Sequence, residues 1–237
     1  MSSTAVKPCW CVIPAAGSGS RFGGHTPKQY LPVAGKPVLL HTLEALLTHP
    51  GIAGVVLVLP ASGECPVALP QTCHGKPVLR TLGGASRAES VANGLAALPA
   101  DVADTDIVLV HDAARPNLAH ADVDALLAAL QQHHAGALLA APVRDTLKRA
   151  DRAGQVLATE PRQALWRALT PQAFARKALA NALAAAASQG IEVTDEAMAM
   201  ELAGEKILLV EGREDNFKIT TPADLARFAW LKESEHS

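Results

Sequence analysis

The sequence has a small net charge, few cysteines and no apolar run of membrane-spanning length, and each of these features excludes a class of protein. The formal net charge is only −2, whereas charge-driven binding of nucleic acid or of a membrane surface needs a strongly basic field. The cysteines form no Cys-x-x-Cys pair, so we interpret them as reduced core or loop residues. No apolar run reaches membrane-spanning length, and the N-terminus has no apolar signal core. We therefore expect a soluble, cytoplasmic protein that binds neither nucleic acid nor membrane.

Familiar enzyme motifs are also missing. The nine histidines show no His-Glu-x-x-His spacing, and no Gly-x-Ser-x-Gly turn carries a nucleophilic serine. Gly17 and Gly19 resemble the start of a dinucleotide fingerprint, but Phe22 stands at the position of its third glycine. Prolines interrupt the stretch 27–37, so no long helix can begin there. A dinucleotide-dependent oxidoreductase is therefore the weakest candidate.

What the sequence does contain is a loop suited to phosphate. The apolar run 9–13 is short, β-branched and aromatic, as expected of a buried strand, and the residues 15–20 after it are all Ala, Gly or Ser. Small residues let backbone N–H groups approach an anion closely. Arg21 and Lys28 follow, and two such cations suit a polyphosphate. On the glycine pattern alone, an ordinary turn with two solvated cations fits equally well.

Strands and helices alternate along the next part of the chain. The pattern predicts strands at 54–59, 77–82, 106–111 and 136–143, helices at 38–49, 88–98 and 121–134, and an irregular segment at 61–76. This order is typical of an α/β fold with a doubly wound, mostly parallel, Rossmann-like sheet. We expect one domain over 1–237. Ligands of such sheets bind at the carboxyl ends of the strands, where the loops 15–28, 83–87 and 112–115 all lie.

The pattern changes after residue 143. Two extended segments, 144–149 and 156–159, predict a hairpin with little apolar surface of its own. Isolated hairpins are marginal in water, so we expect the 144–160 arm to pack on a partner subunit. The remaining predicted elements are a strand at 164–170, a helix at 171–189, a helix capped by Thr194, a strand at 206–210, an extended segment at 216–220 and a closing helix from Thr221-Pro222 to 232.

Polar residues in these segments are candidates for a second substrate site. Asp112 and Arg115 follow the strand 106–111. A carboxylate there can bind a metal-phosphate or substrate hydroxyls, and a guanidinium can grip a phosphate, whereas an internal ion pair in a surface turn is the alternative. Further cations and threonines fit a solvated surface when each is considered alone, and together they suit a second phosphate-bearing substrate. These are Arg162, Thr170, Thr194 and Lys218.

Taken as an ordered set, these segments resemble the 2-C-methyl-D-erythritol 4-phosphate cytidylyltransferases. The resemblance covers about residues 9–230 and rests on Pro14-Ala-Ala-Gly-Ser-Gly-Ser-Arg21, Pro27-Lys-Gln-Tyr-Leu31, Gly83-Gly84 with Arg87 to Ser90-Val91, Val110-His-Asp-Ala-Ala-Arg-Pro116, Ala141-Pro-Val-Arg-Asp-Thr146, Leu169-Thr-Pro-Gln172, Thr194-Asp-Glu196, and Glu211-Gly-Arg213 with Asp215-Asn216 and Lys218.

The resemblance implies a nucleotidyltransferase that moves CMP from CTP to a polyol phosphate, with Mg²⁺, and releases diphosphate. Arg21 and Lys28 would stabilise charge on the triphosphate, and Arg162 and Lys218 would position the second substrate. The implied CTP-binding residues are Pro14, Ala15, Ala16, Gly17, Gly19, Gly83, Gly84, Ala85, Ser90, Asp112 and Ala113. The implied polyol-phosphate ligands are Asp112, Arg115, Thr146, Thr170 and Thr194. Asp112 is the one candidate metal ligand, the ion being held mainly through the CTP phosphates. The resemblance also implies a homodimer in which the arm reaches into the neighbouring site.

Three points stay open from the sequence. Ala85 stands where the family often has an acidic residue, which leaves base selectivity open. The second substrate is either methylerythritol phosphate or another polyol phosphate, such as ribitol 5-phosphate. A non-catalytic nucleotide-binding protein is the alternative from another class, although the joint presence of four well-placed cations argues against it. Because the attacking phosphate is already an anion, the chemistry needs positioning and cations rather than a covalent nucleophile.

Overall fold

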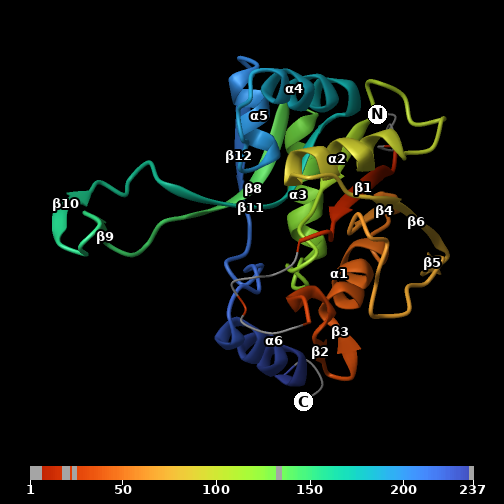
Figure 1. The fold of residues 1–237 in the computed structure, drawn as a ribbon, viewed down its shortest axis with the longest axis horizontal. Helices are drawn as coiled ribbons and strands as arrows, with labels where there is room; N and C mark the ends of the chain where they lie inside the picture. Colours follow the sequence, from red (N-terminus) through yellow and green to blue (C-terminus); the bar gives the residue numbers. More distant parts are fainter. Residues whose placement is uncertain (1–6, 18–21, 23–25, 132–134, 235–237) are drawn as a thin grey trace, which may run out of the picture.

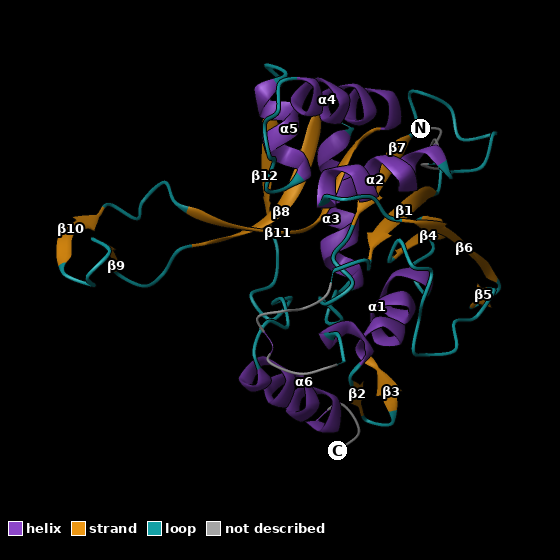
Figure 2. Cartoon of the chain, viewed as in Figure 1, coloured by secondary structure: helices purple, strands orange, loops and turns teal. Residues whose placement is uncertain are grey.

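An eight-stranded sheet forms the centre of the computed structural model, which describes residues 7–17, 22, 26–131 and 135–234 (Figures 1 and 2). The strands lie in the order β12-β8-β11-β7-β1-β4-β6-β5. Their bounds are β1 Cys9–Pro14, β4 Ile52–Leu59, β5 Thr72–Cys73, β6 Lys76–Leu82, β7 Ile107–Val110, β8 Gly136–Pro142, β11 Trp166–Ala175 and β12 Ile207–Glu211. Strand β11 runs antiparallel to both β7 and β8, and β5 runs antiparallel to β6. The other pairs are parallel, so the predicted mostly parallel sheet is confirmed.

Helices cover both faces of this sheet. Their bounds are α1 Val38–Leu47, α2 Arg87–Ala96, α3 His120–Leu130, α4 Arg176–Ser188, α5 Glu196–Leu202 and α6 Pro222–Ser234. Side chains of β1 alternate between two cores, because successive strand residues point to opposite faces. Cys11 and Ile13 pack with α1 and α3, whereas Val12 packs with α2, α4 and α5. This two-sided burial explains why the central strands read as continuous apolar runs. In the part of the chain that is described, no helix is long and apolar enough to cross a membrane.

A smaller layer closes the bottom of the molecule in Figure 1. Lys28–Tyr30 form a short 3₁₀ helix, and β2 (Pro32–Val33) pairs with β3 (Lys36–Pro37) in a tight hairpin. The C-terminal helix α6 packs on this hairpin through buried Phe228. The prolines therefore have the predicted effect, since the chain after the first loop turns back and forth before α1 begins.

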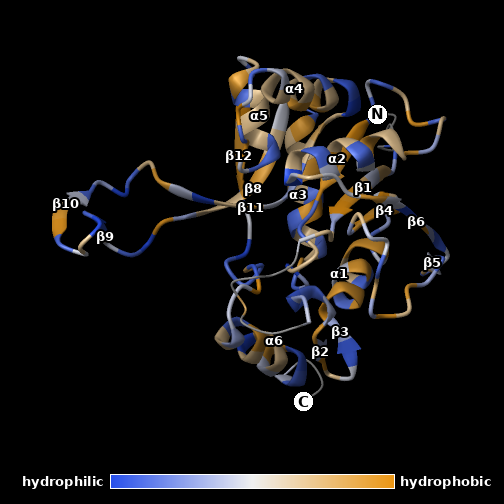
Figure 3. Cartoon of the chain, in the orientation of Figure 1, coloured by the Kyte–Doolittle hydropathy of each residue, from blue (hydrophilic) through white to orange (hydrophobic). Residues whose placement is uncertain are grey.

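The arm predicted at 144–160 is present and projects from the sheet (Figure 1, left). Its strands β9 (Leu147–Ala150) and β10 (Val156–Glu160) pair only with each other, antiparallel. Val156 and Leu157 are 62% and 63% exposed, and Figure 3 shows this apolar segment of β10 far from the core. Within one chain nothing covers these two described side chains. The arm is confirmed as an element, and its contact with a partner subunit stays a prediction.

Two predictions of local structure are wrong. The helix predicted at 171–189 begins only at Arg176, because β11 continues through Ala175 between β7 and β8 and buries Phe174 there. Tertiary pairing thus overrides the helix propensity of an alanine-rich segment. Asp195, not Thr194, caps α5, since its Oδ1 accepts the backbone N–H of Met198 at 2.9 Å. The segment 216–220, predicted only to be extended, lies in the loop between β12 and α6.

Candidate active site

The loops after β1, β6 and β7 meet around one pocket of about 370 Å³. The C-terminal loop before α6 forms its fourth wall. The lining residues are Pro14, Ala16, Gly17, Phe22, Lys28, Gln29, Gly84, Ala85, Ser86, Arg87, Ser90, Asp112, Ala113, Ala114, Lys218 and Thr220. The pocket thus lies at the carboxyl edge of the parallel strands, where the sequence predicts a ligand site.

The loop after β6 packs tightly on the loop after β1. A Cβ on Gly83 would lie 2.9 Å from Ala16 Cβ and 2.7 Å from Ser90 Oγ, so only glycine allows this approach. The N–H groups of Gly83, Gly84 and Ala85 in this loop all donate inside the protein. Gly83 donates to Leu59 O at 2.7 Å, Gly84 to Ser90 Oγ at 3.1 Å, and Ala85 to Glu89 Oε2 at 2.7 Å. The loop is therefore left with carbonyl oxygens, which are hydrogen-bond acceptors, to offer a ligand.

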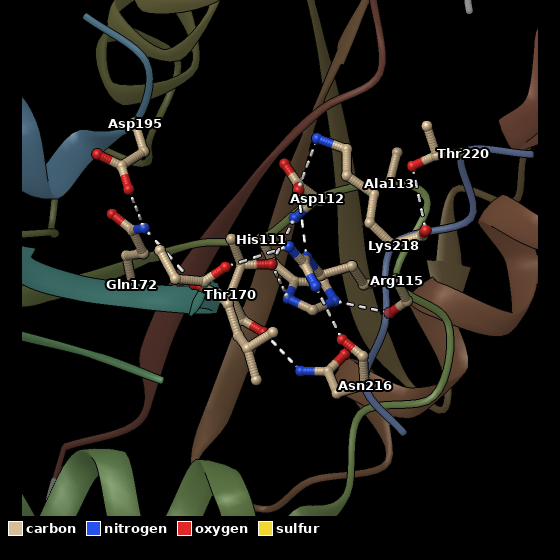
Figure 4. Close-up of polar contacts among 12 residues, drawn as sticks. His111, Asp112, Ala113, Arg115, Thr170, Gln172, Asp195, Asn216, Lys218 and Thr220 are labelled. Atoms are coloured by element: carbon tan, nitrogen blue, oxygen red, sulfur yellow. Dashed lines mark hydrogen bonds and ion pairs between the residues drawn. The ribbon is translucent and has the colours of Figure 1, made fainter. Parts of the chain in front are cut away.

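Asp112 is the centre of a buried charge cluster at the pocket wall (Figure 4). Its Oδ2 lies 2.9 Å from Lys218 Nζ and 3.3 Å from Arg115 Nε, and its Oδ1 lies 3.3 Å from Arg87 Nη2. Arg87 also pairs with the fully buried carboxylate of Glu196. Three cations and two carboxylates from α2, the β7 loop, α5 and the C-terminal loop therefore share one site.

This cluster determines the ionisation of both carboxylates. Burial alone would raise the pKa of Asp112, but Lys218, Arg87 and Arg115 outweigh it and hold that pKa well below its ordinary value. Burial raises the pKa of Glu196, and the attraction of Arg87 only partly opposes this. Asp112 is accordingly an anion at any physiological pH, and it holds three cations around one edge of the pocket.

A chain of hydrogen bonds behind Asp112 fixes its backbone (Figure 4). The N–H of Asp112 donates to Thr170 Oγ1 at 3.1 Å, and Thr170 Oγ1 lies 3.0 Å from His111 Nδ1. The other ring nitrogen, Nε2, lies 2.9 Å from the carbonyl oxygen of Arg115. A carbonyl only accepts, so Nε2 carries the proton, and the Thr170 hydroxyl donates to unprotonated Nδ1. Thr170 Oγ1 thus accepts from Asp112 and donates to His111, whose ring is neutral because burial lowers its pKa to about 4.

His111 is expected to make folding stability depend on pH. Burial lowers the pKa of His111 to about 4, so between about pH 4 and the unfolded-state value of about 6.5 the unfolded chain binds one more proton. The free energy of unfolding should therefore rise with pH across this window, by up to about 1.4 kcal/mol per pH unit from this residue. The free energy of unfolding, measured with urea at several pH values, should rise less steeply with pH in His111→Gln than in the wild type. An equal slope in both proteins would exclude His111 as the titrating group.

Comparison with known proteins assigns the family of this chain. Residues 9–232 match the family model described as 2-C-methyl-D-erythritol 4-phosphate cytidylyltransferase. The chain belongs to this family. A cytidylyltransferase of this name from Xanthomonas euvesicatoria pv. vesicatoria is 59% identical over 92% of this chain and 83% of the relative. One from Stenotrophomonas maltophilia is 57% identical over 94% of this chain and 95% of the relative.

Solved cytidylyltransferase structures share the fold. The structure from Thermus thermophilus is 34% identical, with a TM-score of 0.77 over 95% of this chain and 99% of that one. A structure of 4-diphosphocytidyl-2C-methyl-D-erythritol synthase is 37% identical, with a TM-score of 0.81 over 95% of this chain and 99% of that one.

Not every residue implied by the cytidylyltransferase resemblance lies at the pocket. Thr146 is exposed on the arm, and Arg162 is exposed just after it, between β10 and β11, where it donates to the carbonyl oxygen of Arg144. Thr194 is exposed beside α5, and its hydroxyl contacts Met198 Sδ. The predicted residues Ala15, Gly83, Arg115 and Thr170 are buried directly behind the lining. Arg21 and Gly19 lie outside the described residues.

The structure also adds residues that the sequence reasoning missed. Arg87 and Gln29 line the pocket, and Glu196 anchors Arg87. Gln172 donates to Asp195 Oδ2 at 2.9 Å and accepts the N–H of Ala197 at 2.8 Å, which holds the first turn of α5 in place. Gln29, Arg87, Gln172 and Glu196 all lie inside the motifs shared with the family, so the motifs alone could have marked them as candidate site residues. Their partners, which define their roles, lie far away in the chain.

Proposed function

We propose that this chain transfers CMP from CTP to 2-C-methyl-D-erythritol 4-phosphate and releases diphosphate, as a single domain with its 144–160 arm. The observation that carries the proposal is the convergence of three strand-end loops on one pocket. There a small-residue backbone loop, Lys28 and the Asp112–Lys218–Arg87 cluster face the same space. Family membership supplies the substrates, which agree with this chemistry: one side of the pocket suits a triphosphate and the other holds several cations.

The base side of the pocket supports CTP over UTP. The loop 83–85 has carbonyl oxygens to offer, because its N–H groups donate within the protein. Cytosine carries an exocyclic amino group, a hydrogen-bond donor, where uracil carries an acceptor. Acceptors in the loop therefore favour cytosine. Because the backbone carbonyl oxygens would recognise cytosine, no acidic side chain is needed at Ala85.

The reaction needs charge stabilisation rather than a covalent enzyme intermediate. An oxygen of the methylerythritol phosphate attacks the α-phosphorus of CTP, and the bond from that phosphorus to the oxygen bridging to the β-phosphate breaks. Diphosphate leaves with the electron pair. Lys28 lines the pocket and would stabilise the developing charge together with Arg21, while Lys218, held by Asp112, would face the second substrate.

We infer that the enzyme uses a magnesium ion held mainly through the phosphates of CTP. Among the described residues, no group of three or more His, Cys, Asp or Glu side chains could hold a metal. Of the described residues that line the pocket, Asp112 alone carries a carboxylate, and three cations already surround it. Mg²⁺ commonly binds through one or two carboxylates, waters and substrate phosphates, where it neutralises phosphate charge. Asp112 and the CTP phosphates would hold it here.

Assay with matched substrates tests the function. Purified protein with CTP and Mg²⁺ should release diphosphate faster with methylerythritol phosphate than with ribitol 5-phosphate. The reverse order would assign the sister activity on ribitol phosphate. Tight CTP binding without diphosphate release from either substrate would assign a nucleotide-binding protein.

The free cysteines of the described chain suit a reducing compartment, and we place the enzyme in the cytoplasm.

We also propose that the arm completes the pocket of a second subunit in a homodimer. Thr146 lies on the arm and Arg162 directly follows it, and neither lines the pocket of its own chain. The apolar β10 residues Val156 and Leu157 are exposed without a partner chain. If the arm crosses to the neighbour, both observations have one explanation.

Mixing inactive variants tests this exchange. In a Lys28→Ala/Arg162→Ala heterodimer, one site receives both defects and the other receives neither. After subunit exchange, an equal mixture of the two variants should recover about a quarter of the wild-type activity. A Lys28→Ala/Lys218→Ala mixture is the matched control, because both lysines line the pocket of one chain and no intact site forms. No recovery in the first mixture would show that each arm serves its own chain, or that Arg162 acts elsewhere.

A further inference from the structure

The side chain of Gln29 binds the backbone of the small-residue loop 15–17 that follows β1. This side chain is buried, and the amide Nε2 donates to Ala15 O at 3.0 Å and to Gly17 O at 2.9 Å. Both partners are carbonyl oxygens, which only accept, so the NH₂ group and not the amide oxygen must face them. The two hydrogens of one amide are thus used to hold two peptide groups of the same loop.

The bond to Ala15 determines which way the loop presents the N–H of Ala16. In a trans peptide the carbonyl of one residue and the N–H of the next point in opposite directions. Fixing the carbonyl of Ala15 toward Gln29 therefore turns the N–H of Ala16 to the opposite side. The N–H of Ala15 donates to Val58 O of β4 at 2.8 Å, so the start of the loop is anchored to the sheet as well.

The same side chain links the loop to Lys28. Gln29 follows Lys28 directly in the short 3₁₀ helix, and Ala16, Gly17, Lys28 and Gln29 all line one pocket. A shift of the Gln29 amide would therefore move a backbone anion site and a cation relative to each other. Positioning errors of about 1 Å can cost about 100-fold in rate.

We propose that Gln29 is a positioning residue that orients the backbone N–H of Ala16, in the loop 15–17, toward the CTP phosphates and holds Lys28 in register with it. This inference rests on the proposed function, since CTP is the ligand that the loop would bind. Gln29 does not contact the reacting atoms in this role. It acts through Ala15, Gly17 and its neighbour Lys28.

The isosteric variant Gln29→Glu gives a readout that a purely structural role would not produce. An ionised carboxylate has no hydrogen to donate and would repel both carbonyls, whereas a protonated carboxyl can donate one hydrogen bond. We expect CTP binding, measured by calorimetry without the second substrate, to be at least about tenfold weaker than wild type at pH 8. The ratio to wild type should recover as the pH falls and the introduced carboxyl gains a proton.

Two further variants complete the test. Gln29→Met has a similar volume and no donor, so its CTP binding should be weaker by at least about tenfold at every pH. Gln71→Glu makes the same charge change at an exposed position outside the pocket and should bind CTP like the wild type. Wild-type CTP affinity in folded Gln29→Met, or a Gln29→Glu defect that does not change with pH, would overturn the proposal. Failure of the wild-type protein to bind CTP would instead count against the proposed function.

Discussion

Replacing Lys28 by alanine should reduce turnover at least about 100-fold, equivalent to about 3 kcal/mol of activation free energy, and leave the fold intact. Lys28 begins the 3₁₀ helix that borders the pocket, next to the loop expected to bind the triphosphate. Charge grows on the phosphate oxygens as the bond to the diphosphate breaks. A cation that is already in place stabilises that charge without reorganisation, so its loss should lower kcat more than it raises KM.

Lys36→Ala is the matched control for this variant. Lys36 lies outside the pocket lining, and its Nζ pairs with Glu44 at 2.5 and 2.7 Å, with more than a third of the side chain exposed. Its loss should leave turnover close to wild type. Steady-state kinetics with CTP varied, together with thermal unfolding, separates the two cases. Nearly unchanged turnover in folded Lys28→Ala would remove this residue from the mechanism.

Periodicity predicted the central fold well because the strands are buried on both faces. β1, β4, β7 and β8 are short apolar runs, and each strand ends within one or two residues of its expected position. The error at β11 has a physical reason. Its residues after Thr170 resemble the alanine-rich helix that follows, and only pairing with β7 and β8 makes them extended. Pairing between distant strands cannot be read from a local pattern.

The candidate site was predictable to the extent that it lies in strand-end loops. The pocket contains Lys28, Asp112 and Lys218 as expected from their places in the motifs. Roles that depend on distant partners could not be predicted. Arg87 and Glu196 are 109 positions apart in sequence, yet their ion pair fixes one wall of the pocket. The roles of Thr170 and Arg115 could not be predicted for the same reason. Thr170 binds the backbone of Asp112 and Arg115 binds its carboxylate, both from inside the protein.

Asp112→Asn should destabilise the protein by about 3–5 kcal/mol, the cost of breaking a buried ion pair by removing one partner. Asparagine keeps the volume but leaves Arg87, Arg115 and Lys218 close together around a neutral group. The change should also abolish most activity, because Lys218 would lose the carboxylate that positions it 2.9 Å away. Denaturant unfolding measures the first effect, and the diphosphate assay measures the second.

Asp104→Asn provides a control with similar contacts and different burial. Asp104 pairs with Arg176 and Lys177, both at 2.9 Å, but its side chain is 47% exposed whereas that of Asp112 is 10% exposed. Solvent screens exposed pairs, so Asp104→Asn should change stability far less than Asp112→Asn. Equal losses in the two variants would show that burial does not strengthen the Asp112 cluster.

The pH dependence of the Asp112→Asn effect identifies its cause. Because the pKa of Asp112 is lower in the folded protein than in the unfolded chain, its ionised form stabilises the fold above the unfolded value of about 3.9. That contribution is lost as the pH falls below this value, when the unfolded chain takes up a proton that folded Asp112 resists. The difference in unfolding free energy between wild type and Asp112→Asn should therefore be largest above about pH 5 and shrink below about pH 4. A difference of constant size across that range would mean that the variant loses packing or hydrogen bonds, and that the three cations do not depend on the charge of Asp112.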